Sequence, residues 1–297
     1  MMEELLERGG PGTEFERAAQ AVVAAALRLG DQRSAGRAYL ALGHGYYYAA
    51  RLRELVGVCR QAVAASRAAG DALVMADALV LLARCSYHLR HHDETRALLT
   101  EASAVFQAHA DRFGEANVLG ARSRVRQSAG ETDLAVADAE QALALHQGLS
   151  DGCRVAFALY ELGVVLGAAG RTTESAARLT AALTLFGDRH NRLWEGLTLF
   201  RLAENRLATG RAEEAAQLAR TAAVTMEEVR NDWGRGHALA VLGSALGRLG
   251  DTDGARAHWR SAYEICARLG MPEADDLLVL LGDEPERRGG AAPAPVP

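Results

Sequence analysis

Apolar side chains recur along this chain at helical spacing, in segments separated by glycine and by residues that cap helices. In the first clear segment the apolar positions follow at steps of 3, 3, 1 and 3, on one helix face: Gly36, Tyr39, Leu42, Gly43 and Tyr46. In the next segment the steps are 4, 3 and 4: Leu55, Cys59, Ala62 and Ser66. These faces must pack against each other and against the following segments, so the pattern predicts helix hairpins.

The hairpin pattern repeats along the chain. Six alanines stand at steps of forty residues: Ala62, Ala102, Ala142, Ala182, Ala222 and Ala262. A second row in the same phase holds only glycine or alanine: Gly36, Ala76, Ala116, Ala156, Gly196 and Gly236. A third row holds large apolar residues: Tyr39, Leu79, Leu119, Leu159, Leu199 and Leu239. Three rows in one phase indicate a tandem repeat of forty residues.

The breaks between helices keep the same phase. Capping residues recur at steps of 40, 40, 40, 40 and 41: Asp31, Asp71, Asp111, Asp151, Asn191 and Asp232. A second break follows within each unit at a glycine: Gly130, Gly170, Gly210 and Gly250. Because glycine ends a helix in the left-handed conformation and Asp or Asn caps the next one, each unit is predicted to be two helices joined by a tight turn.

This organisation predicts an all-α solenoid with four parts. Residues 1–31 are expected to form an N-terminal partial repeat or cap, and residues 32–270 six tandem repeats. A capping helix is expected at 271–283, because Pro272 stands in the favoured first turn of a helix. Residues 284–297 are rich in Pro, Gly and Ala and are expected to be disordered.

The repeat resembles the tetratricopeptide-repeat (TPR) family. The family signature of an aromatic residue, Leu-Gly and Tyr appears in the first unit as Tyr39, Leu42, Gly43 and Tyr46. The sixth unit extends it: Leu239, Leu242, Gly243, Leu246, Ala255, Trp259 and Ala262. The resemblance covers residues 13 to 282 and implies a right-handed superhelical solenoid of antiparallel helix hairpins.

The repeats also depart from the family pattern. The usual repeat has about 34 residues, and the forty-residue form is similar to that of kinesin light chains and of the C-terminal arrays of bacterial signal-transduction ATPases and transcription activators. Units two and three have Ala83 and Ser123 in place of the signature glycine, and Arg122 stands in place of leucine.

Composition excludes several functions. The chain has no lysine, which rules out a pyridoxal phosphate Schiff base, a Walker loop and a kinase active site. A net charge of −5 disfavours direct binding of nucleic acid. The start of the chain lacks the pattern of a signal peptide, and no run of 18 apolar residues occurs, so we expect no membrane association and a cytoplasmic location. The four cysteines show no paired spacing and are expected to be buried, reduced thiols.

In this family the first helix of each hairpin lines the concave surface, so the candidate binding residues lie one step round from the buried stripe. They are Arg37, His44, Tyr47, Asp77, Arg84, Tyr87, His88, Asn117, Arg124, Phe157, Tyr160, Phe200, Glu204 and His237. Such a groove suits a ligand with an anionic group and an apolar portion, because arginine forms bidentate contacts with anions and exposed aromatic residues mark recognition sites. The alternative is a solvated face with Phe157 and Phe200 packed between helices.

Other motifs predict less. His88 and His92 could ligate a metal, but a solvated turn is favoured because only Asp93 joins them within a turn, and we predict neither a metal nor a cofactor. In the run of three tyrosines, spacing assigns Tyr46 to the core and leaves Tyr47 and Tyr48 for the groove. Catalytic motifs are absent from the sequence, and no catalytic residue is assigned.

The leading hypothesis is a non-enzymatic binding module, a scaffold or sensor in bacterial regulation that holds a protein, a peptide or a small ligand in its groove. The alternative is a small-molecule-binding enzyme or a biosynthetic accessory protein that uses the aromatic and basic residues. A compact pocket closed at both ends would favour the alternative, and an open groove would count against it. The oligomeric state is left open.

Overall fold

The computed structural model describes residues 13–149 and 152–282, and in these ranges the chain forms helices joined by short turns. Fourteen helices follow in order: α2 (Thr13–Leu29), α3 (Gln32–Tyr48), α4 (Leu52–Ala68), α5 (Ala72–His88), α6 (His92–Ala108), α7 (Arg112–Ser128), α8 (Thr132–Gly148), α9 (Gly152–Ala168), α10 (Thr172–Gly187), α11 (Arg192–Ala208), α12 (Ala212–Glu228), α13 (Asp232–Arg248), α14 (Thr252–Leu269) and α15 (Glu273–Leu281). The expectations for residues 1–12, for the cap at Asp151 and for the tail 284–297 lie outside the described residues.

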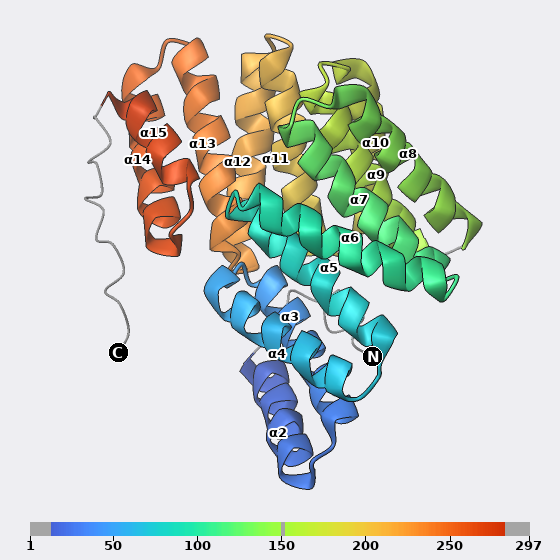
Figure 1. The fold of residues 1–297 in the computed structure, drawn as a ribbon. Helices are drawn as coiled ribbons and strands as arrows, with labels where there is room; N and C mark the ends of the chain where they lie inside the picture. Colours follow the sequence, from blue (N-terminus) through green and yellow to red (C-terminus); the bar gives the residue numbers. More distant parts are fainter. Residues whose placement is uncertain (1–12, 150–151, 283–297) are drawn as a thin grey trace.

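Successive helices pack in pairs, from α3 with α4 to α13 with α14, and α2 and α15 flank the pairs (Figure 1). The predicted fold class is confirmed: the chain is an all-α, right-handed superhelical solenoid of helix hairpins. Helices α3, α5, α7, α9, α11 and α13 also contact one another from one repeat to the next and so form the inner layer. Within the described ranges, no helix is both long and apolar enough to span a membrane.

The rows of small residues are the places where the helices of a hairpin touch. Ala62 and Ala182 are fully buried, as are their equivalents in the other repeats except for a 3% exposure of Ala142. A Cβ atom on Gly36 would lie 2.3 Å from Oγ of Ser66 on α4, and one on Gly196 would lie 2.2 Å from Cε of Met226. A larger side chain in these rows would therefore push the two helices apart.

Every described turn has a left-handed residue, and these residues recur every twenty positions. Glycine supplies it at Gly30, Gly70, Gly130, Gly170, Gly210, Gly250 and Gly270. Larger residues adopt the same conformation at Ala50, Arg90, Ala110, His190 and Arg230. The glycine pattern in the sequence therefore marked only part of a regular series, because a turn enforced by its flanking helices also accepts a strained residue.

One predicted cap is wrong by one residue. The side chain that caps α13 is that of Asn231, whose Oδ1 accepts from the Gly234 amide at 2.7 Å. The predicted cap, Asp232, is instead the first residue of α13. The step from Asn191 is thus forty residues, so the series has no 41-residue step here. Asn231 caps the helix because it stands at the cap position, from which its side-chain oxygen reaches the amide of the third helical residue, whereas Asp232 is already within the helix.

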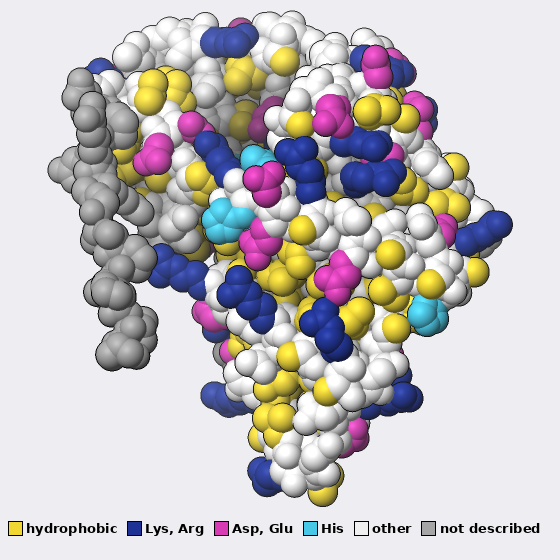
Figure 2. Space-filling model, viewed as in Figure 1, with side chains coloured by type: hydrophobic (Ala, Val, Ile, Leu, Met, Phe, Trp, Pro, Cys, Tyr) yellow, Lys and Arg dark blue, Asp and Glu magenta, His cyan; other side chains and the backbone are white. Residues whose placement is uncertain are grey.

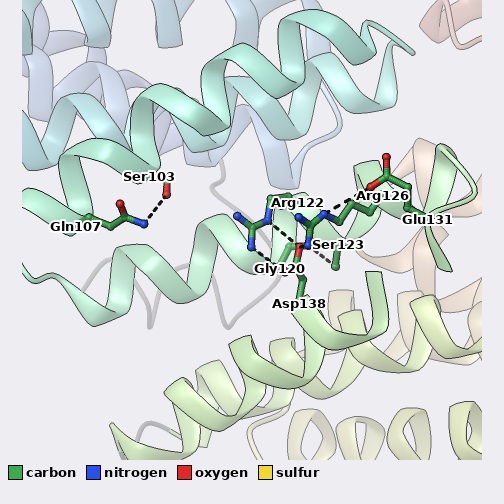
Figure 3. A network of polar contacts seen from close by, with 8 residues as sticks. All are labelled: Ser103, Gln107, Gly120, Arg122, Ser123, Arg126, Glu131 and Asp138. Atoms are coloured by element: carbon green, nitrogen blue, oxygen red, sulfur yellow. Dashed lines mark hydrogen bonds and ion pairs between the residues drawn. The ribbon is translucent and has the colours of Figure 1, made fainter. Parts of the chain in front are cut away.

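Unit three replaces an apolar contact with buried charges (Figure 3). Arg122 donates from Nε and Nη2 to the two carboxylate oxygens of Asp138, both at 2.8 Å, and Arg126 donates to the same carboxylate at 2.7 Å. Asp138 is only 4% exposed, and its equivalents are apolar in three units, at Val58, Leu98 and Leu218, and polar in two, at Arg178 and His258. Arg122 in the leucine position is therefore compensated from the facing helix α8.

Replacing Asp138 by leucine should lower the free energy of unfolding by about 2 to 3 kcal/mol, because two arginines lose their carboxylate and Arg122 is 38% exposed and partly solvated. The double variant Arg122→Leu/Asp138→Leu restores the apolar pattern and should come within about 1 kcal/mol of the wild type. Urea denaturation followed by circular dichroism measures both. Equal losses in the single and double variants would contradict the compensation.

Ala110→Gly should stabilise the fold by about 0.5 to 1 kcal/mol, because a left-handed conformation strains alanine more than glycine. Gly130→Ala at the equivalent turn should cost about 1 kcal/mol, although a Cβ there would meet no neighbour within 4 Å. Thermal unfolding compares the two. Gly57→Ala within α4 is the matched control and should stabilise the fold, since its Cβ is also unobstructed and alanine favours helix. If Gly130→Ala also stabilised the fold, the left-handed turn would not strain alanine.

Candidate ligand cavity

The inner helices enclose a cavity with about 80 Å³ of free space for water-sized molecules, partly open to solvent. It is lined by Tyr47, Tyr48, Ala50, Leu52, Ala83, Arg84, Tyr87, His88, Ala121, Arg124, Tyr160, Glu161, Leu193, Trp194, Leu197, Arg201, Asn231 and Trp233. The early helices contribute residues near their C-terminal ends, whereas α11 and α13 contribute residues near their N-terminal ends. The cavity therefore lies where the two halves of the superhelix meet.

Direct contacts join these two halves across the cavity. The side-chain amide of Asn231 donates to the backbone carbonyl of Tyr48 at 2.8 Å, although the two residues are 183 positions apart. The Tyr48 ring meets the Trp194 ring edge-on, with centroids 6.5 Å apart, and His88 meets Trp233 at 5.3 Å. Asn231 thus uses its oxygen to cap α13 and its nitrogen to hold α3.

A further contact lies outside the cavity, where the turn between α5 and α6 approaches the C-terminal helices. Arg90 pairs there with Asp276 of α15 at 2.8 Å, and both side chains are more than half exposed. Figure 2 shows arginine, acidic and histidine side chains gathered on this face of the molecule. Exposed ion pairs contribute little to stability. The contact between the two halves of the superhelix, which we call its closure, therefore depends mainly on Asn231 and the aromatic contacts.

Two arginines of the cavity share one carboxylate. Nη1 of Arg84 lies 3.3 Å from one oxygen of Glu161, and Nε of Arg124 lies 3.8 Å from the other. The Arg124 guanidinium also lies over the Tyr87 ring, 5.6 Å from its centroid. Nη1 of Arg124 is buried without a hydrogen-bond partner among the described residues. These contacts are longer than a bidentate pair, so both guanidinium groups keep donor capacity.

A third arginine is held on the opposite side. Arg201 donates from Nη1 to Glu204 at 2.9 Å and from Nε to the Tyr160 hydroxyl at 3.5 Å. Its guanidinium lies 4.6 Å from the centroid of Phe200, which is fully buried beneath it. The cavity thus presents cationic groups and aromatic rings together.

The histidines around the cavity are neutral. Burial, with Arg124, Arg201 and Arg84 nearby, lowers the pKa of His88 to about 3. Burial, with Arg201 nearby, lowers the pKa of His237 to about 3. Burial and Arg84 lower the pKa of His44 to about 4. The cationic charge of the site therefore comes from arginine alone.

Comparison with known proteins shows a regulatory protein of similar sequence and solved structures of similar fold. No protein-family model matches the chain. The regulatory protein AfsR of Streptomyces griseus is 34% identical over 278 residues, which is 94% of this chain and 27% of that protein. This chain therefore spans about a quarter of the length of that relative.

Solved structures show the same helical array. A signal transduction ATPase with numerous domains from Pyrococcus horikoshii, which carries a tetratricopeptide repeat sensor, is 15% identical and superposes with a TM-score of 0.54 over 84% of this chain and 43% of its own. This chain therefore has the fold of tetratricopeptide-repeat proteins. A Rap protein in complex with competence and sporulation factor is 13% identical and has a TM-score of 0.64, over 84% of this chain and 74% of its own.

The TPR-like fold of this chain brings part of the predicted set of site residues together. Six predicted residues line the cavity: Tyr47, Arg84, Tyr87, His88, Arg124 and Tyr160. Glu204 and His237 stand behind the wall, where Glu204 accepts from Arg201 and the His237 ring lies 4.2 Å from that of Trp233. His44 is half-buried near Arg84. Phe157 packs on Trp194 at 4.7 Å and Phe200 is fully buried, so these two pack between helices, which is the alternative left open for them.

Three predicted residues lie outside the cavity. Arg37 is exposed and pairs with Asp71 at 3.0 Å. Burial and Asp111 raise the pKa of Asp77 to about 6, and neither Asp77 nor Asn117 lines the cavity. All three stand near the start of their helices, whereas Arg84 and Arg124 stand near the end. The cavity does not include these three residues, because the superhelix brings only the late turns of α3, α5 and α7 to it.

Several residues of the wall were not predicted from the sequence. Glu161 and Arg201 stand one position after Tyr160 and Phe200, in a row that is apolar in the other units as Ala41, Leu81, Ala121 and Val241. Charges in an otherwise apolar row were the signal that could have revealed them. Trp194, Trp233 and Asn231 carried no comparable signal, because they enter only through closure of the superhelix.

The sequence favours a solvated turn for the cluster of histidines, but the structure shows this only in part. His88 lies in the cavity against Trp233, His92 meets the Tyr87 ring at 6.2 Å and His91 lies 3.5 Å from Glu94. Among the described residues, no three His, Cys, Asp or Glu side chains form a group that could hold a metal ion. Cys59, Cys85 and Cys266 are free and buried, and burial raises the pKa of each to about 12.

Acid should destabilise this protein through the cavity histidines. His88 and His237 stay neutral in the folded protein down to a pKa of about 3, whereas the unfolded chain binds protons below pH 6.5. Stability therefore falls as pH drops from 6.5 toward 3, by at most about 1.4 kcal/mol per pH unit for each histidine. Urea denaturation at several pH values should show that the free energy of unfolding depends less on pH in His88→Gln/His237→Gln than in the wild type.

The control is His109→Gln on the exposed end of α6, which should keep most of the acid destabilisation of the wild type. An unchanged slope in the double variant would show that the two cavity histidines are not the cause.

Proposed function

We propose that this chain is a non-enzymatic binding module of a bacterial regulator, which takes a ligand into the cavity between the two halves of its superhelix. The proposal is based on the observation that the two halves of the superhelix meet around the cavity. Asn231 holds Tyr48 across the array, so that Arg84, Arg124 and Arg201 face aromatic rings in one partly enclosed space. Convergent polar groups within an aromatic concavity are the usual features of a ligand site.

The relatives support a regulatory setting. The relative with 34% identity is a regulatory protein, the ATPase of similar fold carries its TPR array as a sensor, and the Rap protein was solved with a bound factor. We infer by analogy that this array is the sensing or scaffolding part of a regulator. The same setting supports the cytoplasm as its proposed location.

Enclosure of the cavity favours a second candidate function. A compact pocket also suits an enzyme or biosynthetic accessory protein that shapes a small substrate. The neutral histidines could move a proton there, but their pKa values of about 3 lie far below neutral pH, which disfavours them as general bases. Chemical change of the bound molecule, followed by mass spectrometry over time, would favour this second function.

Ligand from the host cell should stabilise the wild type through the cavity. We expect the small-molecule fraction of a cell extract to raise the Tm of the wild type, because binding to the folded state alone shifts unfolding. The increase should disappear in Arg84→Ala/Arg124→Ala, which removes both cationic partners of Glu161. Differential scanning fluorimetry measures the shifts, and native mass spectrometry gives the mass of what binds.

Arg37→Ala is the matched control, since Arg37 lies on the same helix layer but outside the cavity. Equal Tm shifts in wild type and double variant would place the binding elsewhere. Stabilisation by the protein fraction alone, again lost with the double variant, would assign the cavity to a macromolecular partner.

A further inference from the structure

We propose that the cavity recognises a small aromatic monoanion, a single carboxylate attached to one aromatic ring. This inference rests on the proposed binding function and names the chemical class of the ligand. Three observations support it: the charge of the wall, the unpaired donors of its side chains, and the size and aromatic lining of the space.

Counted by ion pairs, the wall has one positive charge left over. Arg84, Arg124 and Arg201 are cationic, and among the described residues the carboxylates paired with them are those of Glu161 and Glu204, whereas Glu273 interacts with Arg201 only at longer range. The histidines add no charge, because burial keeps them neutral at physiological pH. A ligand with one negative charge would balance the wall, whereas a dianion such as a phosphate monoester would leave a buried excess of negative charge.

The unpaired buried polar atoms of the wall are all donors. Nη1 of Arg124 and the indole Nε1 atoms of Trp194 and Trp233 are buried and have no hydrogen-bond partner among the described residues. Leaving such donors unpaired costs about 1 to 3 kcal/mol each, and more for the charged one. A carboxylate brings only acceptors, so it would relieve these costs once the side chains turn toward the cavity, since none of the three atoms is exposed to solvent.

Glu161 shows where the ligand carboxylate would bind. It lies between Arg84 and Arg124 at 3.3 and 3.8 Å, and it is itself mostly buried. By comparison, Asp138 draws two arginines to 2.7 and 2.8 Å. Glu161 is therefore a loose internal partner that neutralises part of the site and competes with an incoming anion for the same guanidinium groups.

The lining and the size select one ring. Tyr160 and Trp194 meet edge-on with centroids 5.1 Å apart, and Tyr87 lies under Arg124. Such walls favour a flat apolar group. The free space of about 80 Å³ is roughly half that of an engineered cavity of ~150 Å³ that binds benzene, so it admits no more than one ring, and that ring would extend into the open side of the cavity.

Isothermal titration calorimetry with the full chain at neutral pH tests the class. The probes are benzoate and phenylacetate, each beside its neutral amide, with acetate and inorganic phosphate as anions that lack a ring. We expect at least one aromatic acid to bind at millimolar concentration or below, at least about tenfold more tightly than its amide and than acetate. The tripeptide Gly-Gly-Phe, free or amidated at its C-terminus, distinguishes a peptide end from a free acid as the source of the carboxylate.

Three variants separate this role from a structural one. Arg124→Gln should weaken the aromatic acid by about tenfold or more, because it removes the charge and keeps a polar side chain. Glu161→Gln should strengthen it by about tenfold, since it removes the competing carboxylate. Arg37→Gln should change nothing, because that residue lies outside the cavity. A merely structural Glu161 would give weaker or unchanged binding in its variant.

Equal binding of acid and amide, weaker binding in Glu161→Gln, or binding of phosphate without any aromatic acid would each overturn the proposal. If no probe binds while the cell extract still stabilises the wild type through Arg84 and Arg124, the ligand class is wrong and the binding function stands. If neither the probes nor the extract act through the cavity, both proposals fall.

Discussion

Close contact between helices at small residues is the constraint on which this structure depends. Where Gly36 faces Ser66 and Gly196 faces Met226, even one added methyl group would collide with the partner helix. The buried alanines of the other row keep the same short separation in each hairpin. Because successive hairpins pack in the same way, the small rotation between them accumulates into a superhelix. That accumulated rotation brings α13 back to α3.

Closure changes what the inner side chains can do. In an open array, Arg84 and Arg201 would lie in solvent on separate repeats and act independently. In the closed array they face one space with aromatic walls, so burial both strengthens their interaction with anions and keeps His88 neutral. The contact of Asn231 with Tyr48 joins this electrostatic environment to the curvature, because a change at either end of the array would alter the walls of the cavity.

Two arginine clusters in this chain show how structural charge differs from charge available to a ligand. Asp138 is almost fully buried and receives three short hydrogen bonds, so Arg122 and Arg126 are committed to the packing of unit three. Glu161 meets its two arginines at longer distances and leaves Arg124 with an unpaired donor. Similar residue types thus serve the fold in one place and recognition in the other, and geometry distinguishes them.

The sequence by itself determined the repeat, the helices and most of their ends, because these depend on local spacing, capping and the size of side chains that touch nearest neighbours. It also placed Arg84, Arg124 and Tyr87 on the inner layer, since one phase repeats through all units. Only the tertiary structure decided that Arg37, Asp77 and Asn117 stay outside the cavity while Arg201, Trp194 and Asn231 enter it. Their positions depend on the rotation summed over several repeats. This rotation brings the C-terminal ends of the first inner helices to the N-terminal ends of α11 and α13, and it leaves no local pattern in the sequence.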